Sequence, residues 1–203
     1  MSLFFTADTH FCDDFALSFG HIKRDGRPFK DVNQMDRTMI RNFNKKAKKN
    51  DIIYCVGDFL NYNSFDLNSW KRGIKVVKKI KAKVVLIFGN QETRIMKEKF
   101  NDNYEKFKQF LLDAGFYEVY EKGLELECVD NDKQNVKLYL NHYPSLTRKE
   151  CFNLFGHIHN RCYVKRYGIN VGVDCNYFNL MSLKDVMNLK ESIEKYMDEE
   201  VFY

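Results

Sequence analysis

The chain has 203 residues, of which 44% are hydrophobic and 30% are charged, and its formal net charge is +5. A chain of this length and composition can bury a sizeable core, so a disordered or fibrous protein is excluded, and we expect one domain over residues 1–203. The mild positive excess favours anionic ligands, but it supports nucleic-acid binding only weakly. No apolar run approaches the ~20 residues of a membrane span, so no membrane association is expected.

The first part of the chain alternates short apolar runs with amphipathic segments. Three apolar runs predict strands that are covered on both faces, at residues 2–7, 52–56 and 84–88. Three segments with apolar residues at helical spacing predict helices, at about 31–50, 67–80 and 93–114. Asp31 has the form of an N-cap for the first of these helices. The alternation is typical of a parallel sheet with right-handed crossovers.

The pattern changes after residue 115. Apolar and charged residues alternate over 124–128 and 136–140, which is the period of a strand with one face in water. The turn cluster at 130–133 between them predicts an antiparallel hairpin. Two further buried strands are expected, at 151–155 and 168–173. Ser182 and Asp185 have the spacing of a capping box at the start of a final helix.

Polar residues follow these apolar runs at the point where each predicted strand ends. Five strand ends carry nitrogen and oxygen donors, namely Asp8 with His10, Asp58, Asn90, His142, and His157 with His159. Because ligands of open α/β sheets bind at the carboxyl ends of the strands, we expect these side chains to converge. Imidazole with carboxylate and amide oxygen suits Mn, Fe or Zn better than Ca or Mg. The pattern predicts a site for two divalent transition ions, and Asp58 is the natural bridging ligand because it lies midway in the set.

The ordered series Asp-x-His, Gly-Asp, Gly-Asn-x-Glu, Asn-His and Gly-His-x-His, from residue 8 to residue 159, resembles the signature of the calcineurin-like metallophosphoesterases. Residues 27–29 and 170–174 further resemble the small single-domain bacterial and phage members. The resemblance implies a four-layer α/β/β/α sandwich with mixed sheets. It also implies a division of the donors between two ions that Asp58 bridges, with Asp8, His10 and His159 on one ion and Asn90, His142 and His157 on the other.

The resemblance implies a metal-dependent phosphohydrolase. Its two divalent ions would be manganese in the first place, with iron, zinc or nickel as alternatives. A hydroxide that bridges the ions would attack phosphorus in line. The expected catalytic residues are Asp58, Asn90, Gln91 and His142. The expected substrate contacts are Asn90, Gln91, His21, Arg24 and Arg27, of which the last three belong to the first long loop.

Gln91 departs from the family pattern, because a histidine normally stands at this position. That histidine contacts the phosphate and protonates the leaving oxygen, whereas glutamine has no proton to give near neutral pH. General acid catalysis is typically worth ~10²–10⁴-fold, so slower turnover of esters with poor leaving groups is expected. Some relatives that lack the histidine hydrolyse phosphodiesters, and we therefore expect phosphodiesters, including those of nucleotides, as substrates.

Two other functions fit the same residues. A metal-bound scaffold would present its loops to a protein partner, as the retromer subunit with this fold does. A nuclease would act on a nucleic acid and would lose activity above ~200 mM salt. Four aromatic residues are candidates for stacking a nucleobase or for ordinary loop packing, namely Phe11, Phe15, Phe59 and Tyr62.

The cysteines bear on the compartment in which the chain works. Six of them are scattered without a CxxC pair, which predicts reduced thiols. No charged leader precedes the first apolar run. A cytoplasmic location is therefore expected.

Overall fold

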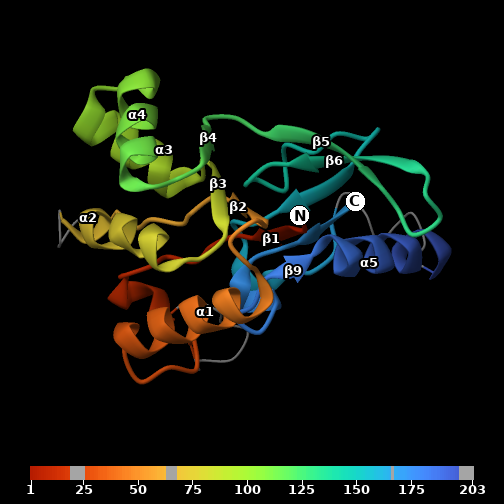
Figure 1. Cartoon of the computed structure of the whole chain (residues 1–203), viewed down its shortest axis with the longest axis horizontal. Coiled ribbons are helices and arrows are strands. Elements are labelled where there is room, and N and C mark those ends of the chain that lie inside the picture. Colours follow the sequence, from red (N-terminus) through yellow and green to blue (C-terminus); the bar gives the residue numbers. More distant parts are fainter. Residues whose placement is uncertain (19–25, 63–67, 166, 197–203) are drawn as a thin grey trace.

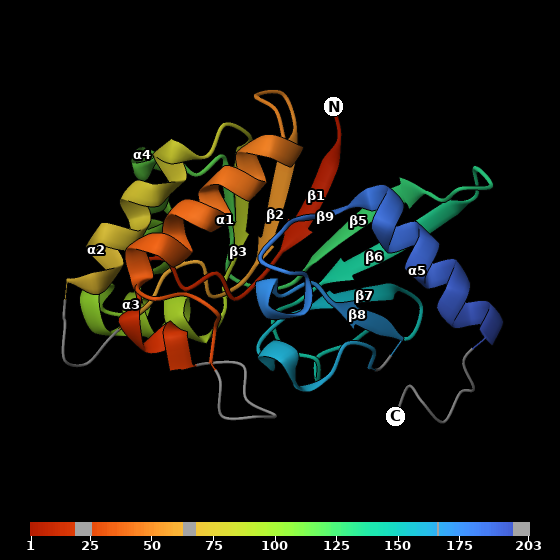
Figure 2. The ribbon, with the colours of Figure 1, turned by 90° about the horizontal axis from the view of Figure 1, so that it is seen from below.

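The structure is a computed structural model that describes residues 1–18, 26–62, 68–165 and 167–196. Two mixed sheets pack face to face, with helices α1 to α4 on one flank and α5 on the opposite flank (Figure 1, Figure 2). The α/β/β/α sandwich expected from the sequence is confirmed. In the part of the chain that the structure describes, every helix is too short or too polar to cross a membrane.

The first sheet carries the predicted parallel strands. Its order is β4-β3-β2-β1-β9, with β1 at Leu3–Thr6, β2 at Ile52–Val56, β3 at Lys83–Ile87, β4 at Glu118–Tyr120 and β9 at Met181–Ser182. Strands β1 to β4 run parallel, and β9 joins β1 antiparallel. The sequence gives no signal for β4 and β9, because two or three residues are too few to show a period.

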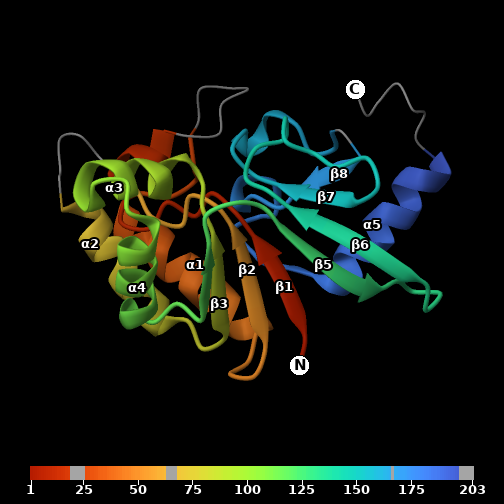
Figure 3. The ribbon, with the colours of Figure 1, turned by 90° about the horizontal axis from the view of Figure 1, so that it is seen from above.

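Four helices cover the outer face of this sheet and share a core with it (Figure 3). They are α1 at Val32–Lys46, α2 at Ser69–Gly73, α3 at Asn90–Phe100 and α4 at Tyr104–Ala114. The Asp31 side chain caps α1 by accepting from Gln34 N at 2.7 Å, as predicted. The single helix expected over 93–114 is wrong, because Asn101 and Asp102 adopt left-handed backbone and end α3. The helix expected over 67–80 is also wrong in part, since a 3₁₀ segment at Ile74–Lys79 follows α2.

The second sheet has the order β5-β6-β7-β8, with β5 at Leu124–Val129, β6 at Asn135–Leu140, β7 at Phe152–Phe155 and β8 at Gly168–Asn170. The predicted antiparallel hairpin is β5 with β6, while β6, β7 and β8 run parallel. Helix α5 at Leu183–Tyr196 begins at the predicted capping box, in which Ser182 N donates to Asp185 Oδ2 at 2.9 Å and Asp185 N donates to Ser182 Oγ at 3.2 Å. Apolar residues of α5 join the core between the two sheets.

The carboxyl ends of the parallel strands in both sheets meet along one edge of the molecule. Backbone hydrogen bonds hold their loops together, because Asp8 N donates to Gly57 O at 3.0 Å and Gly156 N donates to His142 O at 3.1 Å. Ala7, just after β1, forms a parallel β-bridge with Gly172, just after β8, and this bridge joins the two sheets directly. Residues that follow different strands are thereby brought to one place.

Candidate metal centre

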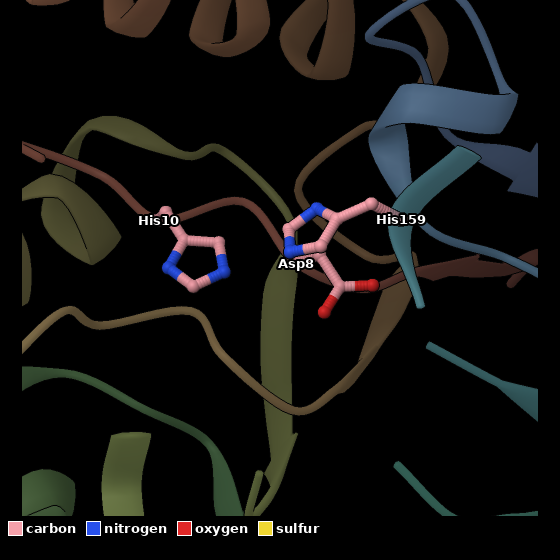
Figure 4. Close-up of side chains that lie close together, drawn as sticks. All are labelled: Asp8, His10 and His159. Carbon is pink, nitrogen blue, oxygen red and sulfur yellow. The ribbon is translucent and has the colours of Figure 1, made fainter. Parts of the chain in front are cut away.

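The loops at this edge bring the predicted donors together. Ligand atoms of Asp8, His10 and His159 lie within 4.8 Å of one another, and those of Asp8, Asp58 and His142 form a second such group. Figure 4 shows the first group, in which His10 comes from the loop after β1 and His159 from the loop after β7. Each sheet therefore contributes to the same cluster.

Asn90, the first residue of α3, lies between His142 and His157. Its Oδ1 is 3.1 Å from His142 Nε2 and 3.0 Å from His157 Nδ1. Asp58 belongs to the second group and also approaches the first, because its Oδ2 is 3.5 Å from His142 Nε2 and 3.6 Å from His10 Nε2. This is the place that a bridging carboxylate would occupy.

The spacing of the donors fits divalent transition ions. Ligand atoms bound at ~2.0–2.2 Å to one ion lie about 3–3.5 Å apart, which is close to the separations just given. Two of the imidazoles also direct Nδ1 at a protein oxygen that is not itself a candidate ligand, since His142 Nδ1 is 3.0 Å from Val56 O and His159 Nδ1 is 2.8 Å from Asp174 Oδ2. Such partners fix the tautomer and leave Nε2 for an ion.

Five of the candidate ligands adopt left-handed backbone. The φ angles are 55° at Asp8, 47° at His10, 53° at Asp58, 73° at His157 and 50° at His159. For residues with a Cβ this conformation costs roughly 1–2 kcal/mol each. Strain of this kind clusters at functional sites, where the surrounding fold enforces it.

Glycines allow backbone to approach the ligands closely. A Cβ on Gly89 would lie 2.2 Å from Asp58 Oδ1, and a Cβ on Gly57 would lie 2.3 Å from His142 Nδ1. Gly57 also has a φ of 88°. The glycine in each of these two motifs is therefore required by contact with a neighbouring candidate ligand.

Burial shifts the pKa of three candidate ligands, namely His10, Asp58 and His157. It raises the pKa of Asp58 well above its usual value, and the neighbouring charges of Glu92 and Asp8 raise it further. Burial lowers the pKa of His10 and of His157. A divalent cation favours ionised carboxylates and neutral imidazoles, so it would relieve the carboxylate repulsion that the fold builds into this place.

Glu92 is a structural member of the centre to which the sequence analysis gave no role. Its side chain is fully buried, and its carboxylate accepts from the backbone N–H groups of Asp58, Leu60 and Gly89, each at 2.9 Å. These three bonds fix the loop after β2 to the start of α3. The signal in the sequence is the position of Glu92 three residues after Gly89, which is the spacing of a capping box.

Glu92→Gln is expected to destabilise the chain by about 2 kcal/mol, because the new amide group faces a buried N–H and leaves it without an acceptor. The measurement is urea unfolding of the metal-free protein. Glu98→Gln on the same helix is the matched control, and it should change stability by less than ~0.5 kcal/mol because the Glu98–Arg94 pair is exposed. Equal effects of the two substitutions would contradict the role assigned to Glu92.

The residues predicted to contact the substrate differ in where the structure places them. Arg27 has a fully buried side chain that bonds to Asp174 and to backbone carbonyls, so its assignment to substrate binding is replaced by a structural role. His21 and Arg24 lie outside the described residues. Gln91 is half-buried, and its Oε1 accepts from Tyr62 N at 3.0 Å.

The aromatic candidates for base stacking are mostly in the core. Phe11, Phe59 and Tyr62 are buried, so they pack the loops instead. Phe15, in a 3₁₀ turn at Asp14–Ser18, is 65% exposed. Of these four residues, Phe15 alone is largely exposed.

The chain is similar in sequence and in fold to known proteins. A family model described as calcineurin-like phosphoesterase matches residues 1–194. An uncharacterized protein of Methanocaldococcus jannaschii, MJ1445, is 29% identical over 93 residues, which cover 44% of this chain and 46% of that protein. The match thus spans about half of that relative. A protein of unknown function from Aquifex aeolicus, AQ665, has a crystal structure with a TM-score of 0.62 and 22% identity, over 93% of this chain and 98% of that chain. At this identity the likeness concerns the fold alone.

Proposed function

Because this chain belongs to the calcineurin-like phosphoesterase family, whose model spans residues 1–194, we propose that it hydrolyses phosphate esters at a two-ion centre. The observation that carries the proposal is the position of Asp58. Its Oδ2 lies within 3.6 Å of a histidine from each of the two donor groups. One carboxylate shared by two sets of imidazoles is what a dinuclear site requires.

The centre would divide its donors between the two ions. Asp58 would bridge, with Asp8, His10 and His159 on one ion and Asn90, His142 and His157 on the other. Two divalent ions bound there would supply an acidified water as nucleophile and positive charge for the phosphoryl oxygens. The mixed nitrogen and oxygen donors favour manganese, with iron, zinc or nickel as alternatives.

The exposure of the candidate residues supports one direction of approach for the substrate. Asp8, His10, Asp58 and His142 are buried, whereas Asn90, Gln91, His157 and His159 reach solvent. A phosphate would therefore meet Asn90 and Gln91 at the start of α3. The Gln91 amide can donate a hydrogen bond to a phosphoryl oxygen, but it cannot protonate a leaving group. We propose phosphodiesters, including those of nucleotides, as the substrates.

A neighbouring cavity supports a sizeable leaving group. It has a volume of about 410 Å³, and its lining includes Thr93 of α3 together with Tyr139 and Tyr143. The ring centroid of Tyr143 is 5.1 Å from that of His142 and 4.9 Å from that of His157. A cavity of this size holds a small organic group, so we propose that it accepts the alcohol part of the ester.

The decisive measurement uses the full chain after treatment with a chelator. Bis(4-nitrophenyl) phosphate should not turn over without metal, and turnover should return with Mn²⁺ and exceed that of 4-nitrophenyl phosphate. Ion binding without turnover of either ester would favour the scaffold instead. Turnover of single-stranded DNA that disappears above ~200 mM salt would favour a nuclease.

We also propose that residues 1–203 act as a single domain in the cytoplasm. The candidate donors come from both sheets, so neither sheet would hold the centre alone. All six cysteines are free thiols, a state that a reducing compartment preserves.

A further inference from the structure

Arg27 and Asp174 form a buried ion pair beside the candidate metal centre. Arg27 Nε and Nη2 donate to Asp174 Oδ1 and Oδ2, both at 2.8 Å, and the two side chains are 0% and 3% exposed. Two parallel bonds between guanidinium and carboxylate give the most directional form of such a pair. The two residues are 147 positions apart in the sequence. The pair therefore joins the loop before α1 to the 3₁₀ turn at Val173–Cys175.

The same guanidinium holds the turn that carries two candidate ligands. Arg27 Nη2 donates to Asp8 O at 2.6 Å, and Nη1 donates to Thr9 O at 3.1 Å. These carbonyls belong to the turn in which Asp8 and His10 adopt left-handed backbone. Arg27 thus supplies bonds that help to keep this turn in its strained conformation.

Asp174 in turn holds a third candidate ligand. Its Oδ2 lies 2.8 Å from His159 Nδ1. A carboxylate paired with arginine can only accept a hydrogen bond, so Nδ1 of His159 must carry the proton. That tautomer leaves Nε2 of His159 with a lone pair for an ion.

From these contacts we infer that Arg27 and Asp174 are positioning residues for one of the two ions, the one held by Asp8, His10 and His159. The inference rests on the proposed two-ion centre. The other ion is supported separately, because His142 Nδ1 is aligned by Val56 O at 3.0 Å and Asn90 lies between His142 and His157. Loss of the Arg27–Asp174 pair is therefore expected to lower the affinity for one ion and to leave the affinity for the other unchanged.

The test is Mn²⁺ titration of the chelator-treated full chain by calorimetry, with the wild-type chain expected to bind two ions. Asp174→Leu removes the acceptor for His159 and should weaken one ion 10–100-fold, the usual effect of losing a partner of a ligating histidine. Arg27→Lys keeps the charge without the paired donors and should weaken the same ion about 10-fold. Lys190→Met, which breaks an exposed ion pair on α5, should change neither affinity.

A double variant separates positioning from folding. Asp174→Leu alone leaves a buried arginine without its carboxylate, which lowers stability. Arg27→Met with Asp174→Leu removes both charges and should recover part of the lost thermal midpoint of the metal-free chain, the rest being lost with the bonds to Asp8 O and Thr9 O. The affinity for the affected ion should stay low in the double variant. Recovery of affinity together with stability, or equal weakening of both ions, would overturn the inference and leave the two-ion centre standing. A wild-type chain that binds fewer than two ions would overturn both.

Discussion

Asp58→Asn is expected to lower metal-dependent turnover by at least ~1,000-fold, which corresponds to ~4 kcal/mol of transition-state stabilisation. Asp58 Oδ2 faces one imidazole of each donor group, and an amide lacks the negative charge that two cations need between them. The measurement is kcat/KM for bis(4-nitrophenyl) phosphate with saturating Mn²⁺.

This substitution should leave the fold in place. Asparagine has the shape of aspartate and tolerates the left-handed backbone found at Asp58. The Asp58 backbone N–H can still donate to Glu92. Asp113→Asn, an exposed position on α4, is the matched control and should keep full activity. An Asp58→Asn chain with wild-type turnover would remove the basis of the proposed enzyme.

Gln91→His is expected to raise turnover of esters with poor leaving groups ~100-fold while changing activated aryl esters only a few-fold. Gln91 lies in the first turn of α3, and its backbone N–H donates to Asp58 Oδ1 at 2.9 Å, so its side chain starts next to the proposed bridging ligand. An imidazole at this position can protonate the leaving oxygen, and such catalysis is worth ~10²–10⁴-fold.

The measurement is kcat/KM for a series of alkyl and aryl phosphodiesters, plotted against the pKa of the leaving alcohol. The wild-type slope should be steep, and the slope of the histidine variant should be shallow. Gln91→Asn serves as the control, because it also removes the side-chain carbonyl from its contact with Tyr62 N without adding an acid. An equal gain for good and poor leaving groups would show that protonation does not limit this chain.

Strand periodicity and turn chemistry made much of the fold predictable. The apolar runs that became β1, β2 and β3, the β5–β6 hairpin and the Ser182 capping box each carry a local signal. The break between α3 and α4 also has a local signal, which the prediction of one helix over 93–114 overlooked. Asn101 and Asp102 adopt left-handed backbone there, and Asn103 caps α4.

The convergence of the candidate ligands was also predictable, because the carboxyl ends of parallel strands share an edge. Their supporting residues were not. Asp174 meets His159 across a turn after β8, and Arg27 reaches Asp174 from a loop before α1. Such contacts depend on how distant loops fold together. A loop arginine therefore looks in the sequence like a surface residue that is open to a phosphate.

The left-handed backbone at the five candidate ligands also affects how similar sequences are compared. At such a turn the chain tolerates glycine, asparagine and aspartate far better than β-branched residues, whatever the chemistry at the site. Asp8 and Asp58 could be replaced by asparagine in a related protein with little damage to folding, because the amide oxygen can still accept from the backbone N–H groups of His157 and Gln91. Such a protein would keep the spacing of the motifs after losing the charge that binds an ion. The spacing of the motifs therefore indicates the backbone conformation of the turns, whereas metal binding depends on the carboxylates at Asp8 and Asp58 themselves.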